Sequence, residues 1–397
     1  MGDSTGISWT DASWNPIRGC SRVSEGCRHC YAERVAARFS GPGQPYEGLA
    51  RRKLTIVNNE EHDPGNQSDA RWTGEVRLIS ERLADPLRWK KPRRIFVNSM
   101  SDLFHEKLSN EQIAAVFGVM AAATQHTFQV LTKRAKRMRE WFAWLDAHVE
   151  ADAEEWSGRD CATNIHAASD ACRLEYLDET ASAALAGHYD VCHLGLTTSK
   201  NLKWPLRHVW LGVSVENQAA ADERIPDLIA TPAAVRFLSC EPLLGEVSLG
   251  LWLVGATAHK ILRDHGASGP VPQHLQPPTS IDWIIGGCES GPGARPCDVA
   301  WLRSLRNQCA IGGVAFFLKQ AREDIERCME GCGEVVRYRI DKLGNCDAAC
   351  KCTTKGAESC NAVGICEGPG SKRKARGVIE LPYLDGIQHA NFPGAAR

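Results

Sequence analysis

The chain has 397 residues, of which 43% are hydrophobic and 24% charged, and its formal net charge is −1. This balance is ordinary for a globular enzyme, and it excludes binding to nucleic acid through an overall positive charge. No apolar run approaches the roughly 20 residues that cross a membrane, and the polar residues 1–11 do not resemble a signal peptide. We therefore expect a cytoplasmic protein, whose 17 cysteines favour metal binding because disulfides are rare in that compartment.

Three cysteines lie close together near the start of the chain. Cys20, Cys27 and Cys30 are spaced C-x6-C-x2-C, and Tyr31 follows the third. Three thiolates can hold three corners of a metal cluster and leave a fourth corner open for chemistry. A structural zinc site usually has four protein ligands, and no fourth cysteine lies nearby in the sequence. The alternative is a zinc site completed by a distant ligand, such as His29 or a cysteine of the C-terminal region.

Short apolar runs alternate with helical patterns along most of the chain. Helices are expected from Tyr31, over about 110–124 and over 133–144. Eight strands are expected, one leading into Cys20 and the others at 75–79, 94–99, 127–132, 208–215, 235–240, 281–286 and 314–318. Strands that alternate with helices predict a parallel sheet. We therefore predict an α/β fold with a full or partial βα (TIM-like) barrel.

Two segments interrupt this alternation. Residues of about 145–205 are rich in Ala and Asp, and we expect a largely helical insertion there. Seven cysteines lie between Cys328 and Cys366, in a stretch with little helix or strand pattern, and a basic run follows. We predict a barrel over 1–327 and a cysteine-rich C-terminal extension over 328–397. The extension could hold structural zinc or a second iron–sulfur cluster, and the spacing does not separate the two.

The ends of the predicted strands are polar. In a βα barrel, functional residues gather at the carboxyl ends of the strands. The polar residues there are Asn98, Ser99, Ser101, Asp102, His105, Glu106, Thr132, Lys133, Ser214, Glu216, Asn217, Cys240, Glu241, Cys288, Glu289, Ser290, Lys319 and Gln320. For any single one of them, a helix cap or a solvated ion pair is an equally good explanation. The basic runs of the chain could contact phosphates, although such runs are more often solvated helix faces.

The motif N-P-x-R-G-C, followed by C-x-x-C-Y-A, resembles the cluster loop of radical S-adenosylmethionine (SAM) enzymes, in particular the branch related to spore photoproduct lyase. Motifs at the predicted strand ends resemble a phage-associated family of such proteins: F-V-N-S-M-S-D-L-F-H, V-L-T-K-R, W-L-G-V-S-V-E-N-Q, R-F-L-S-C-E-P-L-L-G and F-F-L-K-Q. The usual cysteine spacing in radical SAM enzymes is C-x3-C-x2-C. The segment 21–26 therefore resembles a three-residue expansion of that loop, which the phage-associated family shares.

The resemblance implies a cofactor and a set of site residues. Cys20, Cys27 and Cys30 would ligate three irons of a 4Fe-4S cluster, and SAM would bind the fourth iron. An electron donor such as flavodoxin or ferredoxin would supply the electron that cleaves SAM to a 5′-deoxyadenosyl radical. Contacts to SAM are expected from Ser99, Asp102, Ser214, Glu216 and Glu241. Catalytic groups are expected at Lys133, Cys240 and Cys288.

Relatives in that family occur beside phage genes for hypermodified thymidine, so the resemblance implies a substrate in DNA. The reaction would convert an N-linked glycyl-thymidine into its C-linked isomer, in the host cytoplasm if the protein is phage-encoded. Such a modified base would help phage DNA to evade host restriction. Two alternatives stay open. One is a DNA repair lyase of the thymine-photoproduct type, with Cys240 or Cys288 as hydrogen donor, and the other is a non-catalytic zinc-binding module that contacts nucleic acid.

Overall fold

The computed structural model describes a continuous core and several short segments. The described residues are 5–51, 55–57, 60–62, 70–155, 205–250, 252–253, 281–291, 293–321, 325–327, 335–337, 365–366, 379–380, 383–384, 387–388 and 391–393. Most of the predicted insertion and most of the cysteine-rich extension lie outside these residues. Among the described helices, none is long and apolar enough to span a membrane.

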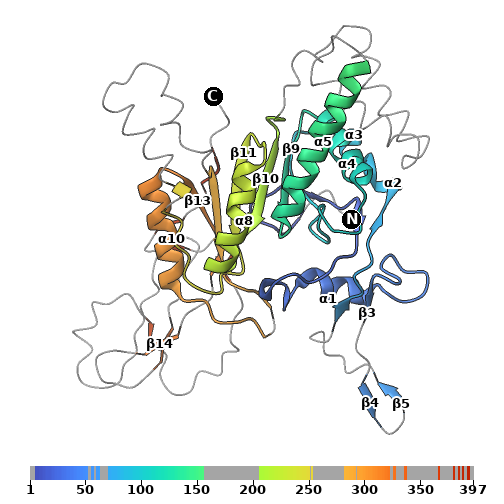
Figure 1. Cartoon of the computed structure of the whole chain (residues 1–397). Coiled ribbons are helices and arrows are strands. Elements are labelled where there is room, and N and C mark those ends of the chain that lie inside the picture. Colours follow the sequence, from blue (N-terminus) through green and yellow to red (C-terminus); the bar gives the residue numbers. More distant parts are fainter. Residues whose placement is uncertain are drawn as a thin grey trace, which may run out of the picture.

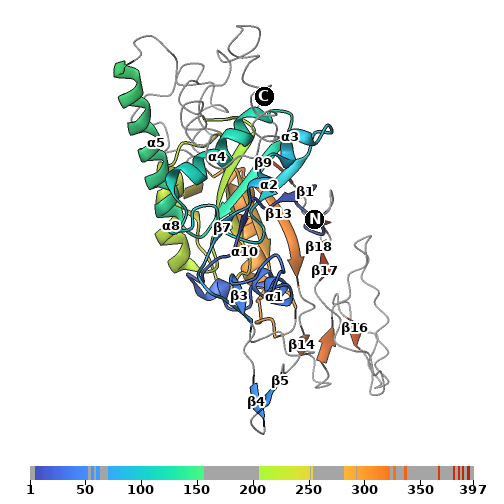
Figure 2. The same cartoon turned by 90° about the vertical axis from the view of Figure 1, so that its right-hand side faces the viewer.

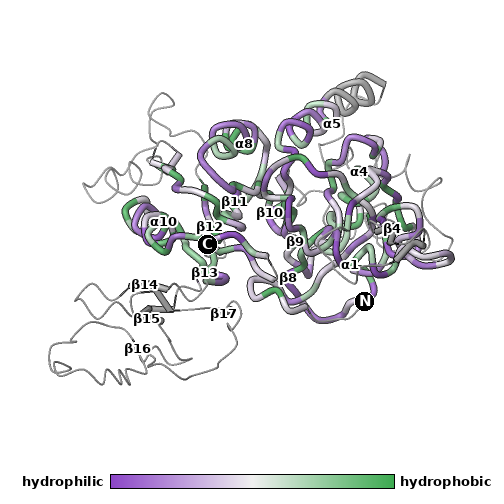
Figure 3. Tube along the Cα trace, turned by 90° about the horizontal axis from the view of Figure 1, so that it is seen from below, coloured by the Kyte–Doolittle hydropathy of each residue, from purple (hydrophilic) through white to green (hydrophobic). Residues whose placement is uncertain are grey.

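The main sheet is curled into a half-barrel (Figure 1). Its seven parallel strands follow one another in the sheet in the order of the chain: β1 (Ala12–Trp14), β8 (Arg94–Val97), β9 (Thr127–Thr132), β10 (Val209–Ser214), β11 (Val235–Cys240), β12 (Trp283–Gly287) and β13 (Ala315–Ala321). An eighth strand, β17 (Ile379–Glu380), pairs antiparallel with β13. Viewed along the strands, the sheet forms an arc with helices outside it (Figure 3). The prediction of an α/β fold with a partial βα barrel is therefore confirmed.

Seven of the eight predicted strands lie in this sheet, and the strand predicted at 75–79 does not. There the structure has the two-residue strand β7 (Arg77–Leu78), which pairs antiparallel with β2 (Ile17–Arg18). The chain turns into α2 (Ser80–Leu83) directly afterwards. The strand is thus too short to cross the sheet, and it supports the segment that leads into Cys20.

The helices between the strands cover the convex face of the sheet. They are α4 (Asn110–Ala122), α5 (Ala135–Glu155), α8 (Gln218–Ala230) and α10 (Val299–Gly312). Helix α4 begins with a capping box, in which Ser109 and Gln112 bond to each other's backbone. Helix α5 runs eleven residues beyond the predicted end at 144, and so enters the segment assigned to the insertion. Figure 2 shows α5 and α8 on one side of the sheet and β17 on the other.

The remaining elements are short. They are η1 (Glu25–Cys27), α1 (Tyr31–Arg38), α3 (Asp85–Arg88), the strand pairs β3 (Ala50–Arg51) with β6 (Arg71–Trp72), β4 (Thr55–Val57) with β5 (Glu60–His62) and β18 (Tyr383–Leu384) with β19 (Ile387–Gln388), and the three-stranded sheet of β14 (Ile325–Arg327), β15 (Val335–Arg337) and β16 (Ile365–Cys366). Between 328 and 366, where little strand structure is expected, the described strands are the short β15 and β16.

Alternate side chains of the strands face two different cores. On the convex side, residues such as Val97, Leu238 and Ile284 pack against the helices. On the concave side, aromatic rings fill the inside of the half-barrel. The ring centroids of Trp9 and Phe96 lie 4.7 Å apart. The other buried members of this concave cluster are Phe237, Trp283, Ile285 and Phe317. The concave face is therefore closed by rings, as in a filled barrel, up to the level of the strand ends.

A segment near the end of the chain also packs on the concave cluster. The ring of Phe392 lies 5.2 Å from that of Trp283, and Trp283 Nε1 donates to the carbonyl oxygen of Asn391 at 2.8 Å. Arg94, from the opposite side of the arc, stacks over the Phe392 ring at 4.2 Å. Residues on both sides of the boundary predicted at 327 therefore contribute to the half-barrel.

Candidate functional site

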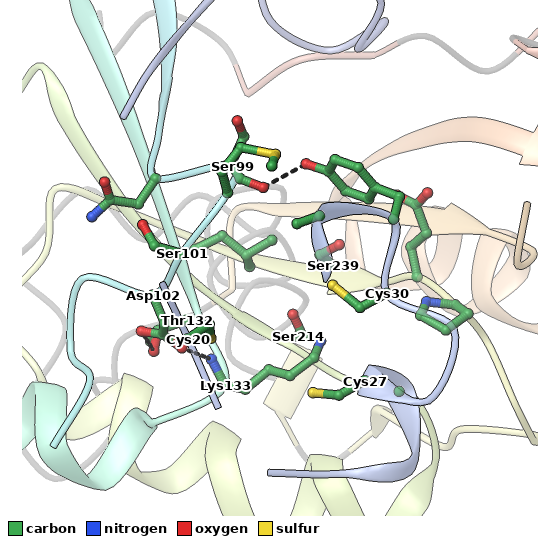
Figure 4. A pocket seen from close by; sticks show the side chains of 18 of the residues that line it. Cys20, Cys27, Cys30, Ser99, Ser101, Asp102, Thr132, Lys133, Ser214 and Ser239 are labelled. Carbon is green, nitrogen blue, oxygen red and sulfur yellow. Dashed lines mark hydrogen bonds between the residues drawn. The ribbon is translucent and has the colours of Figure 1, made fainter. Parts of the chain in front are cut away.

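A cavity of about 250 Å³ lies at the carboxyl ends of the parallel strands, close in size to the smaller ligand sites of proteins. All three cysteines of the N-terminal motif line it (Figure 4). Of the eleven predicted site residues, nine line the cavity: Cys20, Cys27, Cys30, Ser99, Asp102, Lys133, Ser214, Glu241 and Cys288. The two that do not are Cys240 and Glu216. The structure thus brings together predicted site residues from six separate stretches of the chain.

A glycine directly precedes each of the first two cysteines, and close approach requires both. Gly19 has a φ of +92°, and a Cβ placed there would lie 2.1 Å from the carbonyl oxygen of Glu75. A Cβ on Gly26 would lie 2.3 Å from a carboxylate oxygen of Glu216. Only glycine fits these positions without a shift of the neighbours. The cysteine loop therefore packs closely against the segment that leads into β7 on one side. On the other side it packs against the residues that follow β10.

Glu216 holds the middle of the cysteine loop. Ser24 Oγ donates to its Oε1 at 2.7 Å, Arg224 Nη1 donates to its Oε2 at 2.7 Å, and Lys133 Nζ lies 3.1 Å from Oε1. Burial alone would raise the pKa of this carboxyl, but the cations of Lys133 and Arg224 outweigh it and lower the pKa. Glu216, which is predicted to contact SAM, does not line the cavity, and both of its oxygens are bound by Ser24, Lys133 and Arg224.

A second buried ion pair holds the start of the loop. The Asp102 carboxylate accepts from Thr132 Oγ1 at 2.7 Å and from Arg134 Nη1 at 3.0 Å. Arg134 Nη2 in turn donates to Ser21 Oγ at 2.7 Å, next to Cys20. Asp102 also accepts from the backbone of Phe104 and Lys133. With both of its oxygens engaged, Asp102 is suited to position Cys20 and its neighbours rather than to bind a ligand.

The far side of the loop is fastened to the segment after β12. His29 Nδ1 lies 3.0 Å from Glu289 Oε2, and Arg295 Nη2 donates to Glu289 Oε1 at 2.6 Å. Arg295 also reaches the carbonyl oxygen of Glu25, in the middle of the loop, at 2.9 Å. Hydrogen bonds from these charged groups are shorter and stronger than neutral ones. Within the widened cysteine spacing, Ser21, Ser24 and Glu25 are thus bound to residues that follow three different strands.

The third cysteine begins helix α1, and contacts with neighbouring segments of the chain hold this helix in place. Cys30 is the N-cap residue, and the hydroxyl of Tyr31 donates to the carbonyl oxygen of Ser99 at 2.6 Å (Figure 4). Glu33, only 1% exposed, forms an ion pair with Arg22 of the loop and accepts from the backbone N–H of Trp72 at 2.7 Å. Direct contacts therefore join the helix to the loop and to the end of β8.

The cysteine thiols are arranged for binding and not for disulfide formation. Cys20, Cys27 and Cys30 are free and partly exposed to the cavity. Burial and the nearby Asp102 raise the pKa of Cys20 to about 12, and burial raises that of Cys30. A thiol with a raised pKa is deprotonated when a cation binds it, so metal binding would offset the cost of burying the thiolates. Among the described residues, no three His, Cys, Asp or Glu side chains converge closely enough to hold a single metal ion.

The cysteine of β11 does not reach the cavity. Cys240 is completely buried in the core between the sheet and the helices, and burial raises its pKa. Its neighbour Ser239 faces the other way and lines the cavity beside Ser214, with which it is paired across β10 and β11. Cys240, which is predicted as a catalytic group, is therefore not among the residues that line the cavity. Strand alternation would have pointed to Ser239 instead.

Several residues at the site were not predicted as such. Ser21, Tyr31 and Ser239 line the cavity, and Arg134 and Arg295 fix it. Arg134 belongs to a basic run that suggested a solvated helix face, but only 5% of its side chain is exposed. Its partners Asp102 and Glu106 lie about thirty residues earlier in the chain, so the pairing had no local signal.

Glu216 gives the apoprotein a pH-dependent contribution to its stability. Because its pKa is lower in the folded than in the unfolded chain, this contribution is present above about pH 4.5, the ordinary value, and is lost as the pH falls through the folded pKa. Replacing Glu216 with Gln is expected to flatten the acid limb of a plot of unfolding free energy against pH. Glu223→Gln, on the exposed side of α8, is the matched control. A Glu216→Gln profile that stays parallel to the wild type below pH 5 would contradict this.

A family model described as "Protein of unknown function (DUF5131)" matches residues 4–342. No curated protein and no solved structure matches the chain. The match covers well over half of the 397 residues and includes the cysteine loop and all seven parallel strands. The chain therefore belongs to the DUF5131 family.

Proposed function

We propose that this protein is a radical SAM enzyme in which Cys20, Cys27 and Cys30 hold a 4Fe-4S cluster. The observation that carries the proposal is the position of these three cysteines. They line one cavity at the carboxyl ends of the strands of a half-barrel, which is where βα barrels carry their active sites. The side of the cavity opposite the cysteines is open to polar strand-end residues, and so offers space for a fourth, exchangeable ligand.

The arrangement of the three thiols supports a cluster over a single zinc ion. Thiolates on one zinc ion would lie within about 4 Å of each other, because each Zn–S bond is about 2.3 Å. The described His, Cys, Asp and Glu side chains form no such tight set, and His29, the nearest alternative ligand, is paired with Glu289. Three cysteines that ligate three different irons are spread farther apart, so the absence of a tight set among the described residues does not count against a cluster.

The chain's own residues would bind and orient the ligands of this cluster. When reduced and bound to SAM, such a cluster supplies a 5′-deoxyadenosyl radical that takes a hydrogen atom from the substrate. Ser99, Ser214 and Ser239 present polar groups to the cavity, and the Lys133 ammonium, 19% exposed, lies among them. The rings of Trp9 and Phe96, in the concave cluster, exclude water from that side of the cavity. A dry, fixed cavity is what a radical intermediate needs from the protein.

For the substrate we propose N-linked glycyl-thymidine in DNA, which the enzyme would convert to the C-linked isomer, and for the electron donor a flavodoxin or ferredoxin. The support for this choice is the resemblance of the strand-end motifs. In the basic run of α5, Arg137 donates to Asn110 Oδ1 at 2.6 Å and Arg139 lies 3.0 Å from Asp227, which leaves the exposed Lys136 as the cation of this run without a buried partner. Further contacts to the DNA backbone would have to come from elsewhere on the surface.

One observation favours a second function, the photoproduct-type lyase. Cys288 lines the cavity but is completely buried at its edge, so in the lyase its thiol would have to turn toward the cavity to return a hydrogen atom to a substrate radical. An isomerase needs no such donor, because the hydrogen can return from 5′-deoxyadenosine. Replacing Cys288 with Ser is therefore expected to leave isomerisation of glycyl-thymidine DNA within about threefold of wild type. Loss of the isomer with continued SAM cleavage would show that Cys288 takes part in the isomerisation, and splitting of a thymine photoproduct by the wild type would establish the lyase.

Metal analysis tests the cofactor half of the proposal. After anaerobic reconstitution we expect about four irons and four sulfides per chain in the N-terminal site, with the broad visible absorbance of an iron–sulfur protein. Zinc alone, with no such absorbance, would support the non-catalytic zinc module. Any metal in the cysteine-rich extension adds to these numbers, so the measurement has to be repeated with Cys20, Cys27 and Cys30 replaced. That second site stays a prediction, because its cysteine side chains lie outside the described residues.

A further inference from the structure

Glu241 and Lys319 form an ion pair on the cavity wall made by the ends of β11 and β13. Lys319 Nζ donates to Glu241 Oε1 at 2.5 Å, and Gln320 Nε2 donates to the same oxygen at 2.8 Å. Gln320 is itself fixed by a 2.6 Å hydrogen bond to the carbonyl oxygen of Cys288. Lys319 and Gln320 therefore fix the orientation of the Glu241 side chain, and its second carboxylate oxygen, Oε2, remains available to a ligand.

The pair keeps unused hydrogen-bonding capacity at the cavity. Both side chains line it, and 15% of Glu241 and 18% of Lys319 is exposed. Within the described part of the chain, Glu241 Oε2 has no hydrogen-bond partner, and Lys319 Nζ has Glu241 alone. An ammonium has three donors and a carboxylate about four acceptor positions. Each member of the pair can thus accept one further charged partner.

The other charged groups that line the cavity are bound to groups that hold the cysteine loop, and Lys133 among them is paired with Glu216. Asp102 accepts four hydrogen bonds, and Arg134 is divided between Asp102, Glu106 and Ser21. Glu289 is held by Arg295 and His29. Their contacts hold the cysteine loop in place. The Glu241–Lys319 pair makes no contact with that loop among the described hydrogen bonds, so fastening the loop does not explain it.

We propose that the Glu241–Lys319 pair binds the ammonium and carboxylate of an α-amino-acid group. Such a group carries opposite charges two bonds apart, and it would lie antiparallel to the pair, with its carboxylate on Lys319 and its ammonium on Glu241 Oε2. Charge-assisted hydrogen bonds in a cavity of this kind give both affinity and orientation. A ligand with only one of the two charges would leave one member of the pair unmatched.

Two molecules of the proposed reaction carry this chemistry, and the inference rests on the proposed function in choosing between them. SAM has an α-amino-acid end, but in that function the open iron beside the cysteines holds it. The glycyl group of N-linked glycyl-thymidine is also a zwitterion, with a secondary ammonium and a carboxylate. We therefore assign the pair to the substrate, where it would fix the glycine α-carbon relative to the thymine ring.

The test is a binding measurement with anaerobically reconstituted, unreduced full-length protein, so that no turnover occurs. The two probes are SAM and the nucleoside 5-[(carboxymethylamino)methyl]-2′-deoxyuridine, titrated separately by calorimetry. The variants are Glu241→Gln, Lys319→Met and the double variant. Because the double variant removes both charges, it leaves no unpaired charge that could disturb folding. Lys136→Met, at an exposed lysine of α5, is the matched control.

We expect the nucleoside to bind roughly 10- to 100-fold more weakly to each single variant and to the double variant, as for the loss of a charge-assisted hydrogen bond. SAM should bind all of them within about twofold of wild type, since fixed contacts elsewhere hold it. Unchanged nucleoside affinity in the double variant would overturn the proposal, and so would a wild type that binds SAM but not the nucleoside. If the variants bound SAM more weakly and the nucleoside with unchanged affinity, the Glu241–Lys319 pair would be a SAM-binding group and the proposal would be overturned. Failure of the proposed function itself looks different, because the wild type would then lack the cluster.

Discussion

Replacing Arg134 with Met is expected to lower the free energy of unfolding by about 3–5 kcal/mol, the usual cost of removing one partner of a buried ion pair. Only 5% of the Arg134 side chain and 8% of the Asp102 side chain is exposed, and the two lie 3.0 Å apart. Although burial disfavours the charged guanidinium, the neighbouring Asp102 and Glu106 raise its pKa. Without it, the Asp102 carboxylate would be buried beside the thiol of Cys20 with no counter-charge.

Denaturant unfolding of the apoprotein measures this effect, with the midpoint and slope fitted separately. The matched control is Arg137→Met, which removes an arginine of the first turn of α5, just after Arg134, that is bound to neutral oxygen atoms. The double variant Asp102→Asn/Arg134→Met should recover part of the loss because it removes the lone charge. A decrease below about 1 kcal/mol for Arg134→Met would mean that water reaches the pair, and that the start of the cysteine loop is not rigidly held.

The strands could be predicted because their signals are local. Runs such as R-I-F-V, T-F-Q-V-L-T and V-W-L-G-V-S are apolar, β-branched or aromatic, and each is followed by polar residues and a helical pattern. The structure places all three in the parallel sheet. The run V-R-L-I at 76–79 has the same composition but only two residues in a strand. Its partner is the segment before Cys20, and that pairing depends on Gly19 and not on hydropathy.

The position of the site could also be predicted, because parallel strands bring their carboxyl ends to one edge. The orientation of each side chain there could not. All six residues of β11 are buried, so hydropathy does not distinguish Ser239, which faces the cavity, from Cys240, which faces the helices. The alternation of side chains between the two faces of the sheet becomes evident only in the structure, where each face packs in a different core.

The anchoring of the cysteine loop was beyond sequence reasoning for a different reason. Ser24 and Glu216 are separated by 192 residues, and His29 and Glu289 by 260. Each residue alone is an ordinary polar residue at a loop or strand end. The widened spacing of the first two cysteines now has a structural explanation, since the residues between them reach partners after β8, β9, β10 and β12.

Replacing Cys27 with Ala is expected to have the largest effect on activity. The cysteine lies between the anchors Ser24 and His29, and no other described cysteine besides Cys20 and Cys30 lines that side of the cavity. A cluster with two remaining ligands should not assemble stably, so SAM cleavage is expected to fall by roughly 100-fold or more. Cys297→Ala, at a buried cysteine away from the cavity, should keep both the cluster and the activity and so controls for a general loss of thiols.

Formation of 5′-deoxyadenosine by the anaerobically reconstituted protein, with SAM and dithionite, tests the central claim most directly. The account predicts that the wild type and Cys297→Ala form it and that Cys27→Ala does not. Its absence from the wild type with a full complement of iron and sulfide, or its persistence in Cys27→Ala, would contradict the assignment of the cysteine loop as the site of a radical SAM cluster.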